Sequence, residues 1–207
     1  MLDKKIILIG YSGHGFVVAD TALENQLNLV EYAEYSIVQN NPFQLNYAGN
    51  ESDNDFFEKN KEAKYLIGIG DNTIRQRIYN LIIEKQGEIV TLISQSASIS
   101  KTASIGNGTF INKNVSINAL AKIGKNVILN TGCVIEHDCV LADGVHIAPG
   151  AVLAGNVTIG ERSFIGANCV IKPGVTIGKD VIVGAGSVVL SDIPDGKKIV
   201  GNPSRFI

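Results

Sequence analysis

The chain has 207 residues, enough for one large domain or two small ones with a sizeable buried core. Its 18 lysine and arginine residues are balanced by 20 aspartate and glutamate residues, which argues against a nucleic-acid binder. The N-terminal apolar run, Ile6–Ile9, is too short for a signal peptide, and no stretch approaches the ~20 apolar residues of a membrane span. We therefore expect a cytoplasmic protein that binds neither nucleic acid nor membrane.

The first third of the chain alternates between strand and helix patterns. Residues 4–26 predict a buried strand, the glycine loop "GYSGHG" and an amphipathic helix, and residues 64–87 repeat that plan around a loop at Gly70–Asn72. Residues 88–94 predict one more strand, and another is expected near residues 29–38. Such alternation is typical of a small parallel sheet of Rossmann type. Its ligands bind at the carboxyl ends of the strands, where both glycine loops would lie.

The second of these helices should bury one apolar face. That face holds Ile74, Ile78, Leu81 and Ile82. Asp71 and Asn72 are interpreted as a helix cap, and Arg75 and Arg77 as residues on the helix surface. The glycines of "GYSGHG" are not spaced as in the dinucleotide fingerprint. That loop is therefore either a tight strand-to-helix turn or a cradle whose backbone N–H groups bind a diphosphate.

From residue 99 onward, an aliphatic residue recurs at every sixth position without interruption. The sixteen residues are Ile99, Ile105, Ile111, Ile117, Ile123, Leu129, Ile135, Leu141, Ile147, Leu153, Ile159, Ile165, Ile171, Ile177, Val183 and Val189. Small or β-branched side chains stand two positions earlier, so both sets should point inward. Glycine or asparagine often follows the aliphatic residue, which we interpret as a turn that tolerates unusual backbone angles. Three units would close one coil, so the pattern predicts a parallel β-helix of about five coils.

All three cysteines, Cys133, Cys139 and Cys169, occupy the small inward position of this repeat. We therefore expect buried thiols and no disulfide. A metal site built from Cys133, His137 and Cys139 is disfavoured, because the histidine would point outward from the coil and the cysteines inward. No metal is expected.

The chain contains only three histidines, His14, His137 and His146. His137 lies two positions after an inward aliphatic residue and His146 one position before the next, so both should point outward from the coil. A histidine at a β-helix corner is often only a solvated residue. Next to Asp138, however, His137 also fits a general base, because imidazole exchanges protons near neutral pH and a carboxylate fixes its tautomer.

Four stretches carry a resemblance to a known family: "GYSGHG", "IGIGDNTIRQRI", "ILNTGCVIEHDCVLADGVHIAPGAVLAGNVTIG" and the ending "VGNPSRFI". Together they resemble the sialic-acid O-acetyltransferase and bacillosamine N-acetyltransferase group of hexapeptide-repeat acyltransferases. The resemblance spans nearly the whole chain and implies an α/β N-terminal Rossmann-like domain followed by a left-handed parallel β-helix, in a homotrimer. It places a sugar-nucleotide-binding domain at residues 1–92 and the acetyltransferase domain, with a C-terminal tail, at residues 93–207.

The resemblance also implies roles for single residues. In the nucleotide-sugar branch of the group, acetyl-CoA lies in a cleft between neighbouring β-helices, and the sugar nucleotide contacts the N-terminal domain. The family's catalytic histidine falls on His137 and its acidic partner on Asp138, where many members have a longer glutamate. A nearby asparagine and glutamate fall on Asn130 and Glu136.

The residues implied in acetyl-CoA binding are His146, close to the thioester, and Gly155, whose backbone N–H would lie near the acetyl group. The histidine of the N-terminal glycine loop, near the phosphates of the sugar nucleotide, falls on His14. Gly13, Gly70 and Asp71 complete the expected substrate-binding set. Many members carry an acidic pair that reads uracil, but the matching region here, "YAEYSIVQNNPF", has no such pair, so the nucleotide base stays open.

These features predict an acetyl-CoA-dependent N-acetyltransferase. It would acetylate the 4-amino group of a nucleotide-linked 4-amino-4,6-dideoxy sugar by direct transfer, with His137 as general base. Two alternatives remain open: an O-acetyltransferase acting on a sialic acid-type sugar, and a non-catalytic trimeric scaffold. The scaffold is disfavoured because it would need neither the His137–Asp138 pair nor His146.

Overall fold

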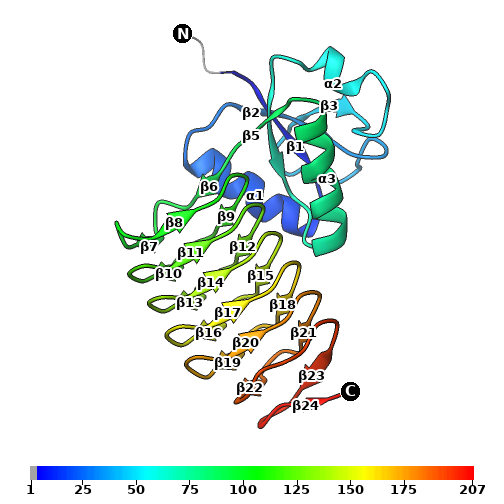
Figure 1. The fold of residues 1–207 in the computed structure, drawn as a ribbon. Helices are drawn as coiled ribbons and strands as arrows, with labels where there is room; N and C mark the ends of the chain where they lie inside the picture. Colours follow the sequence, from blue (N-terminus) through cyan, green and yellow to red (C-terminus); the bar gives the residue numbers. More distant parts are fainter. Residues whose placement is uncertain (1–3) are drawn as a thin grey trace. The chain divides into compact units, whose positions relative to one another are not determined.

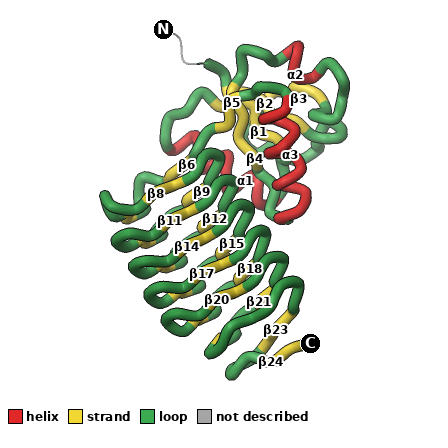
Figure 2. Tube along the Cα trace, viewed as in Figure 1, coloured by secondary structure: helices red, strands yellow, loops and turns green. Residues whose placement is uncertain are grey.

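A computed structural model describes residues 4–207. The chain divides into two compact units, the first ending at Leu92 and the second spanning Ile93–Ile207. The predicted succession of an α/β domain and a β-helix is confirmed (Figures 1 and 2).

The first unit is a five-stranded parallel sheet with three helices. Its strands, in spatial order, are β3 (Asn46–Gly49), β2 (Leu29–Ala33), β1 (Ile6–Ile9), β4 (Lys64–Ile67) and β5 (Glu88–Ile89). Its helices are α1 (Gly13–Glu24), α2 (Phe56–Lys59) and α3 (Asn72–Glu84). The strand order reverses direction around β1, which creates the crevice where open α/β sheets bind ligands.

Glycines allow the ends of β1 and β4 to approach the start of α1. A Cβ on Gly15 or on Gly68 would collide with the carbonyl oxygen of Gly10, a backbone atom that cannot move without moving the chain. Gly10 itself has a φ of 89°, a conformation that glycine adopts without strain. Gly10 and Gly15 of "GYSGHG" are therefore required by a tight strand-to-helix turn, whereas a Cβ on Gly13 would meet nothing within 4 Å.

Three predictions for this unit need correction. The one strand expected at residues 88–94 is divided into two, Glu88–Ile89 in this sheet and Leu92–Ile93 in another. The second strand is shorter than expected, because β2 ends at Ala33, and the polar segment that follows supplies β3 and α2 instead. The buried face of α3 is also shifted by one residue from the predicted one. It consists of Arg75, Ile78, Tyr79 and Ile82, whereas Ile74 is exposed. Arg75 is thus buried, contrary to prediction, and Arg77 lies on the surface as expected.

The second unit is built from strands of two residues, or three in β23, arranged in three sheets (Figure 1). The β7 sheet contains β7 (Ser98–Ile99), β10 (Ser116–Ile117), β13 (Val134–Ile135), β16 (Val152–Leu153), β19 (Val170–Ile171) and β22 (Val188–Val189). The β8 sheet contains β8 (Ser104–Ile105), β11 (Lys122–Ile123), β14 (Val140–Leu141), β17 (Thr158–Ile159) and β20 (Thr176–Ile177). The β6 sheet contains β6 (Leu92–Ile93), β9 (Phe110–Ile111), β12 (Ile128–Leu129), β15 (His146–Ile147), β18 (Phe164–Ile165), β21 (Ile182–Val183), β23 (Lys198–Val200) and β24 (Arg205–Phe206).

The coil repeats every 18 residues, since Ser98 pairs with Ser116 and Ser116 with Val134. All pairings are parallel except that of β23 with β24. Three sheets of short parallel strands are typical of a left-handed β-helix. The aliphatic and small positions both point inward and form one continuous core, as predicted, and the three cysteine thiols are buried within it.

The corners of the coil correct one interpretation of the repeat. The glycines directly after the aliphatic residue do not adopt positive φ. They are needed because a Cβ on Gly106 or Gly160, for example, would collide with the backbone of the next coil. The left-handed conformation falls two positions later, at residues such as Asn126, Asp138 and Asn156. Aspartate and asparagine tolerate this conformation better than other residues with a side chain.

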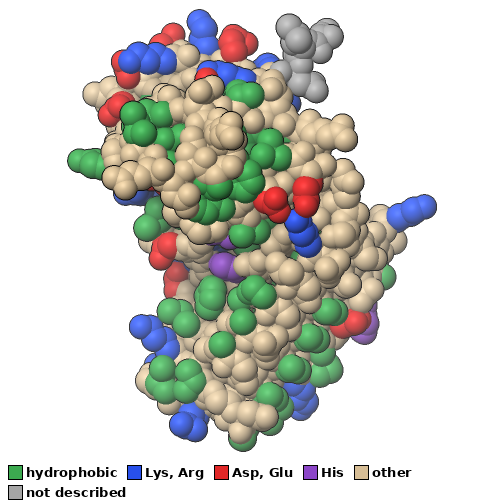
Figure 3. All heavy atoms as spheres, turned by 180° about the vertical axis from the view of Figure 1, so that it is seen from behind, with side chains coloured by type: hydrophobic (Ala, Val, Ile, Leu, Met, Phe, Trp, Pro, Cys, Tyr) green, Lys and Arg blue, Asp and Glu red, His purple; other side chains and the backbone are tan. Residues whose placement is uncertain are grey.

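No helix among residues 4–207 is long and apolar enough to cross a membrane. Hydrophobic side chains do reach the surface of the β-helix, where Figure 3 shows them between polar ones. Examples are Val140, Val170 and Ile182 on the outer faces of the sheets.

Leu120 occupies one of the left-handed corners, with a φ of 64°, and its side chain is 55% exposed. Leucine in this conformation is disfavoured by roughly 1–2 kcal/mol and gains little from packing at such exposure. We expect Leu120→Asn to raise the free energy of unfolding in urea by roughly 0.5–1 kcal/mol. Leu190→Asn is the matched control, because Leu190 is equally exposed but not among the residues with positive φ. Equal effects of both substitutions would contradict the expectation.

Candidate active site

The two residues His137 and Asp138 form a hydrogen-bonded pair at the corner between β13 and β14. Nδ1 of His137 lies 2.9 Å from Oδ2 of Asp138. Asp138 adopts the left-handed corner conformation, with a φ of 60°, and its shorter carboxylate still reaches the ring of its neighbour. With the carboxylate accepting from Nδ1–H, the lone pair of the imidazole lies on Nε2. The His137 side chain is 61% exposed, so it can meet a substrate from solvent.

Gly155 lies one coil further along the same corner column and provides the surface on which the His137 ring rests. A Cβ built on Gly155 would lie 2.5 Å from both Cε1 and Nε2 of the ring. The coils are fixed to each other here, since the backbone N–H of Asn156 donates to the carbonyl of His137 at 2.8 Å. The imidazole can therefore occupy this position only because residue 155 has no side chain. The backbone N–H of Gly155 makes no hydrogen bond to the residues that the structure describes.

Asn130 lies at a different corner, between β12 and β13, and its amide is held in place. Its Oδ1 accepts hydrogen bonds from Nδ2 of Asn112 at 3.0 Å and from the backbone N–H of Thr131 at 2.8 Å. These bonds orient the Asn130 side chain, so its Nδ2 group is the end left for a substrate. Glu136 directly precedes His137, and its carboxylate has no hydrogen-bond partner within residues 4–207.

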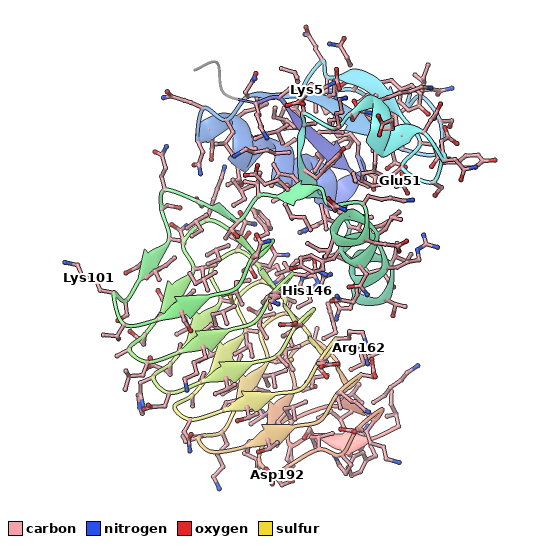
Figure 4. The ribbon with its side chains drawn as sticks, turned by 45° about the horizontal axis from the view of Figure 1, so that its top comes forward. Lys5, Glu51, Lys101, His146, Arg162 and Asp192 are labelled. Carbon is pink, nitrogen blue, oxygen red and sulfur yellow. The ribbon has the colours of Figure 1, made fainter. Side chains whose placement is uncertain are left out.

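His146 lies on β15, with its ring on the outer side of the coil, as the repeat predicts (Figure 4). It is only 7% exposed, however, so the expected outward residue is not a solvated one. Its ring packs edge to face against Phe164 of the neighbouring strand, with the ring centroids 5.0 Å apart. Such packing fixes the orientation of the imidazole.

Within one chain, the predicted β-helix residues thus fall into separate groups. His137, Asp138 and Gly155 come together at the corner between the β7 and β8 sheets. Asn130 lies at the corner between the β6 and β7 sheets, and His146 lies on the β6 sheet. A three-sided coil keeps these positions on different edges.

Two of the predicted residues of the first unit, His14 and Gly70, line one pocket at the carboxyl ends of its strands, whereas Gly13 and Asp71 are not among its lining residues. The pocket has a volume of about 230 Å³. Its wall consists of Gly10, Ser12, His14, Glu34, Glu51, Gly68, Ile69, Gly70 and Ile74. His14 and Gly70 face each other, because a Cβ on Gly70 would touch Cβ of His14 at 3.7 Å. Gly13 is the first residue of α1, and Asp71 caps α3 by accepting the N–H of Ile74 at 2.8 Å.

His14 carries no charge at neutral pH. Burial of its ring, together with the nearby Arg75 cation, lowers the pKa of His14 from 6.5 to about 4. Arg75 is therefore a residue that the sequence analysis missed at this pocket. A signal was present in its spacing, since Arg75, Ile78, Tyr79 and Ile82 follow the pattern of one buried helix face.

Among residues 4–207, no group of three or more histidine, cysteine, aspartate or glutamate side chains could hold a metal ion. The thiols are poor ligands and nucleophiles, because burial raises the pKa of Cys133 to about 12 and also raises the pKa of Cys139 and Cys169. The reactive groups of the β-helix are therefore its imidazoles and carboxylates.

The six-residue repeat and the α/β unit each match a known family. The family described as PglD N-terminal domain matches residues 5–82, and the family described as bacterial transferase hexapeptide (six repeats) matches residues 120–155 and 156–191. No curated protein matches the sequence.

Solved structures match over the full length. Perosamine N-acetyltransferase from Caulobacter crescentus, a histidine-to-asparagine variant with CoA and GDP-perosamine, is 32% identical, with a TM-score of 0.93 over 98% of this chain and 96% of that one. The acetyltransferase domain of PglB from Neisseria gonorrhoeae, with acetyl coenzyme A, is 31% identical, with a TM-score of 0.92 over 99% of this chain and 100% of that one. The chain therefore belongs to the hexapeptide-repeat sugar N-acetyltransferases with a PglD-type N-terminal domain, enzymes that use acetyl-CoA.

A more distant match is AntD, an N-acyltransferase from Bacillus cereus, whose serine-to-alanine variant was solved with dTDP-4-amino-4,6-dideoxyglucose and coenzyme A. It is 26% identical, with a TM-score of 0.55 over 57% of this chain and 80% of that one. The nucleotide base thus differs between similar proteins, guanine in one case and thymine in the other.

The lowered pKa of His14 predicts a pH dependence of stability. The unfolded chain binds a proton at His14 near pH 6.5, whereas the folded chain binds it only near pH 4. The folded state should therefore lose up to about 3 kcal/mol as the pH falls from 6.5 to 4, relative to a chain without this histidine. We expect the unfolding free energies of wild type and His14→Gln, measured in urea, to diverge over this interval. A difference that does not change with pH would contradict the expectation.

Proposed function

We propose that the protein transfers the acetyl group of acetyl-CoA to the 4-amino group of a nucleotide-linked 4-amino-4,6-dideoxy sugar. The main support is the hydrogen-bonded His137–Asp138 pair, whose imidazole packs against Gly155. The chain that carries this pair belongs to the acetyltransferase family described above. The GDP-perosamine bound to one similar protein and the dTDP-4-amino-4,6-dideoxyglucose bound to another support a nucleotide-linked amino sugar as acceptor.

The chemistry begins with a proton. A sugar amine is mostly protonated at neutral pH and attacks a thioester only as the free amine. As the amine nitrogen bonds to the thioester carbon, Nε2 of His137 takes a proton from that nitrogen, and the Asp138 carboxylate stabilises the imidazolium through Nδ1–H. When the carbon–sulfur bond breaks, His137 returns the proton to the departing sulfur, so that CoA leaves as the thiol. No acyl-enzyme is required.

The negative charge that develops on the carbonyl oxygen needs a donor. The backbone N–H of Gly155 is a candidate, because it lies beside the His137 ring and has no hydrogen-bond partner among the described residues. Asn130 offers a second donor, since its Oδ1 is held and its Nδ2 group is thereby oriented. His146, fixed by Phe164, is proposed to contact the thioester end of acetyl-CoA.

A homotrimer explains why these groups lie on different edges of one coil. The groups lie at three places on the β-helix. One corner carries His137 and Gly155, another corner carries Asn130, and the β6 sheet carries His146. We propose that neighbouring chains bring the corner of one β-helix against a side of the next, with acetyl-CoA between them. Glu136, next to the base, then faces the partner rather than its own chain. The site is incomplete without the second copy.

The sugar nucleotide is proposed to occupy the pocket of the first unit. This pocket lies at the carboxyl ends of parallel strands and at the start of α1, where backbone N–H groups favour phosphate. His14, Gly13, Gly70 and Asp71 are the proposed binding residues.

The first test is a thiol-release assay with acetyl-CoA and UDP-, dTDP- and GDP-linked 4-amino sugars, with free sialic acid as a further acceptor. We expect turnover with an amino sugar only, and a loss of 10²–10⁴-fold in kcat for His137→Ala, because the general base is removed. Lys101→Ala is the matched control, since Lys101 lies in the same corner column as His137, two coils away.

Each other outcome changes the assignment. Turnover with sialic acid alone would make the protein an O-acetyltransferase. Absence of thiol release with every acceptor, together with absence of CoA binding, would leave a scaffold. Full activity of His137→Ala would remove this residue from the reaction while leaving the class of enzyme intact.

A pair of glycine substitutions separates positioning of the base from stability of the fold. In Gly155→Ala the three atoms nearest to the new methyl group all belong to the His137 ring, so the ring must move. We expect kcat to fall roughly tenfold or more with the melting temperature retained. In Gly166→Ala the methyl group meets the backbone of residues 183–185, so we expect a lower melting temperature. Equal melting temperatures and equal kcat values for the two variants would contradict this account.

A further inference from the structure

Arg75 stands at a position of α3 that its pattern reserves for an apolar side chain. It shares the buried face of the helix with Ile78, Tyr79 and Ile82, and only 2% of its surface is exposed. Burial of a cation is unfavourable unless hydrogen bonds replace the lost water. A residue that serves stability alone would be expected here to be aliphatic.

The guanidinium group holds the turn that connects β4 to α3. Its Nη1 donates to the carbonyl of Gly70 at 3.1 Å and to that of Ile69 at 3.3 Å, and its Nη2 donates to Oδ1 of Asn72 at 2.9 Å. A planar fork with two terminal nitrogens can satisfy these oxygens together, which the single nitrogen of a lysine cannot do. The Ile69–Asn72 turn is therefore tied to one buried side chain.

This turn is also a wall of the pocket at the carboxyl ends of the strands. Ile69 and Gly70 line it from one side, and His14 packs against Gly70 from α1. We propose that Arg75 is a positioning residue of this pocket: it fixes the Ile69–Asn72 turn and, through it, the place and state of the His14 imidazole.

The charge of Arg75 also affects His14. Burial and the Arg75 cation both lower the pKa of His14, to about 4. Burial also lowers the pKa of Arg75, to about 9, which still leaves the arginine charged at neutral pH. The other ionisable groups around the pocket are carboxylates, namely Glu34 after β2, Glu51 after β3 and the helix cap Asp71. Burial is the larger cause of the lowered pKa of His14 and the Arg75 cation adds to it, whereas these acids would favour protonation.

A neutral imidazole offers one N–H donor and one nitrogen acceptor, in fixed directions. It can hydrogen-bond to a hydroxyl or phosphate oxygen of a nucleotide, but it forms no ion pair. This consequence rests on the proposed function, since it assumes that a nucleotide occupies the pocket. Arg75 itself contacts the wall and is buried behind it, so its effect should appear in binding and not in the chemical step.

The test compares Arg75→Met and Arg75→Lys with Arg77→Met, an exposed arginine of the same helix. NMR titration of the His14 ring gives the first readout. In Arg75→Met the pKa of His14 should rise above about 4, because the cation is gone, while the part of the shift that burial causes remains. In Arg75→Lys it should stay low, and in Arg77→Met it should not move.

Calorimetric titration with GDP, UDP and dTDP gives the second readout. For whichever nucleotide wild type binds, we expect a loss of affinity of tenfold or more in both Arg75 variants, because lysine keeps the charge but not the fork. KM for acetyl-CoA and kcat should stay within twofold of wild type. An unchanged His14 titration in a folded Arg75→Met protein would overturn the proposal. If wild type binds none of the three nucleotides, the proposed function fails, while the His14 titration still decides the role of Arg75.

Discussion

Each coil of the β-helix must approach the next at the spacing of two hydrogen-bonded strands, about 4.8 Å, and this spacing governs the second unit. Inside the coil, it leaves room for one aliphatic and one small side chain per six residues, which explains why the three cysteines are buried there. At the corners, it excludes a Cβ wherever the backbone turns towards its neighbour, as at Gly106 and Gly160. Polar inward residues are stabilised by hydrogen bonds to the next coil. Ser163, for example, donates to the carbonyl of Gly178 and accepts from the N–H of Val181.

The same spacing shapes the candidate site. His137 and Gly155 are neighbours because they lie one coil apart, and the ring rests where a side chain would otherwise stand. Asp138 reaches the ring because its backbone adopts the left-handed corner conformation that the coil requires at that position. No special loop is needed for the pair. The geometry that stacks the coils also places the imidazole and its carboxylate.

The repeat could be predicted from the sequence because the chain has one aliphatic residue at every sixth position and no insertion to obscure it. The two outward histidines followed from the same register. The burial of His146 did not, because edge-to-face packing on Phe164 depends on a residue 18 positions away that no local pattern connects to it. The role of the corner glycines was misjudged for a related reason. A Cβ at these positions would collide with the next coil, and the sequence of a single repeat does not indicate such a collision.

In the first unit, the buried face of α3 could not be assigned correctly while arginine was assumed to be exposed. Hydrophobicity favours a face containing Ile74, whereas the helical spacing of Ile78, Tyr79 and Ile82 selects Arg75. The pocket itself gathers residues from the ends of several strands that are far apart in the chain, such as Glu34 and Gly68. Its position at the strand ends follows from topology, but the presence of two carboxylates beside a neutral histidine does not.

The 18-residue register of the coil has an evolutionary consequence. Every corner column repeats nearly the same backbone, with left-handed positions at Asn126, Asn156 and Asn168 as well as at Asp138. Reactive side chains can therefore be exchanged on one coil while the interior of all coils stays unchanged, because the corner residues project away from the core. The corner of His137 differs from its neighbours in having a glycine, Gly155, at the matching position of the next coil. The reactive groups of such a protein can therefore change by substitution at corners alone, without redesign of the fold.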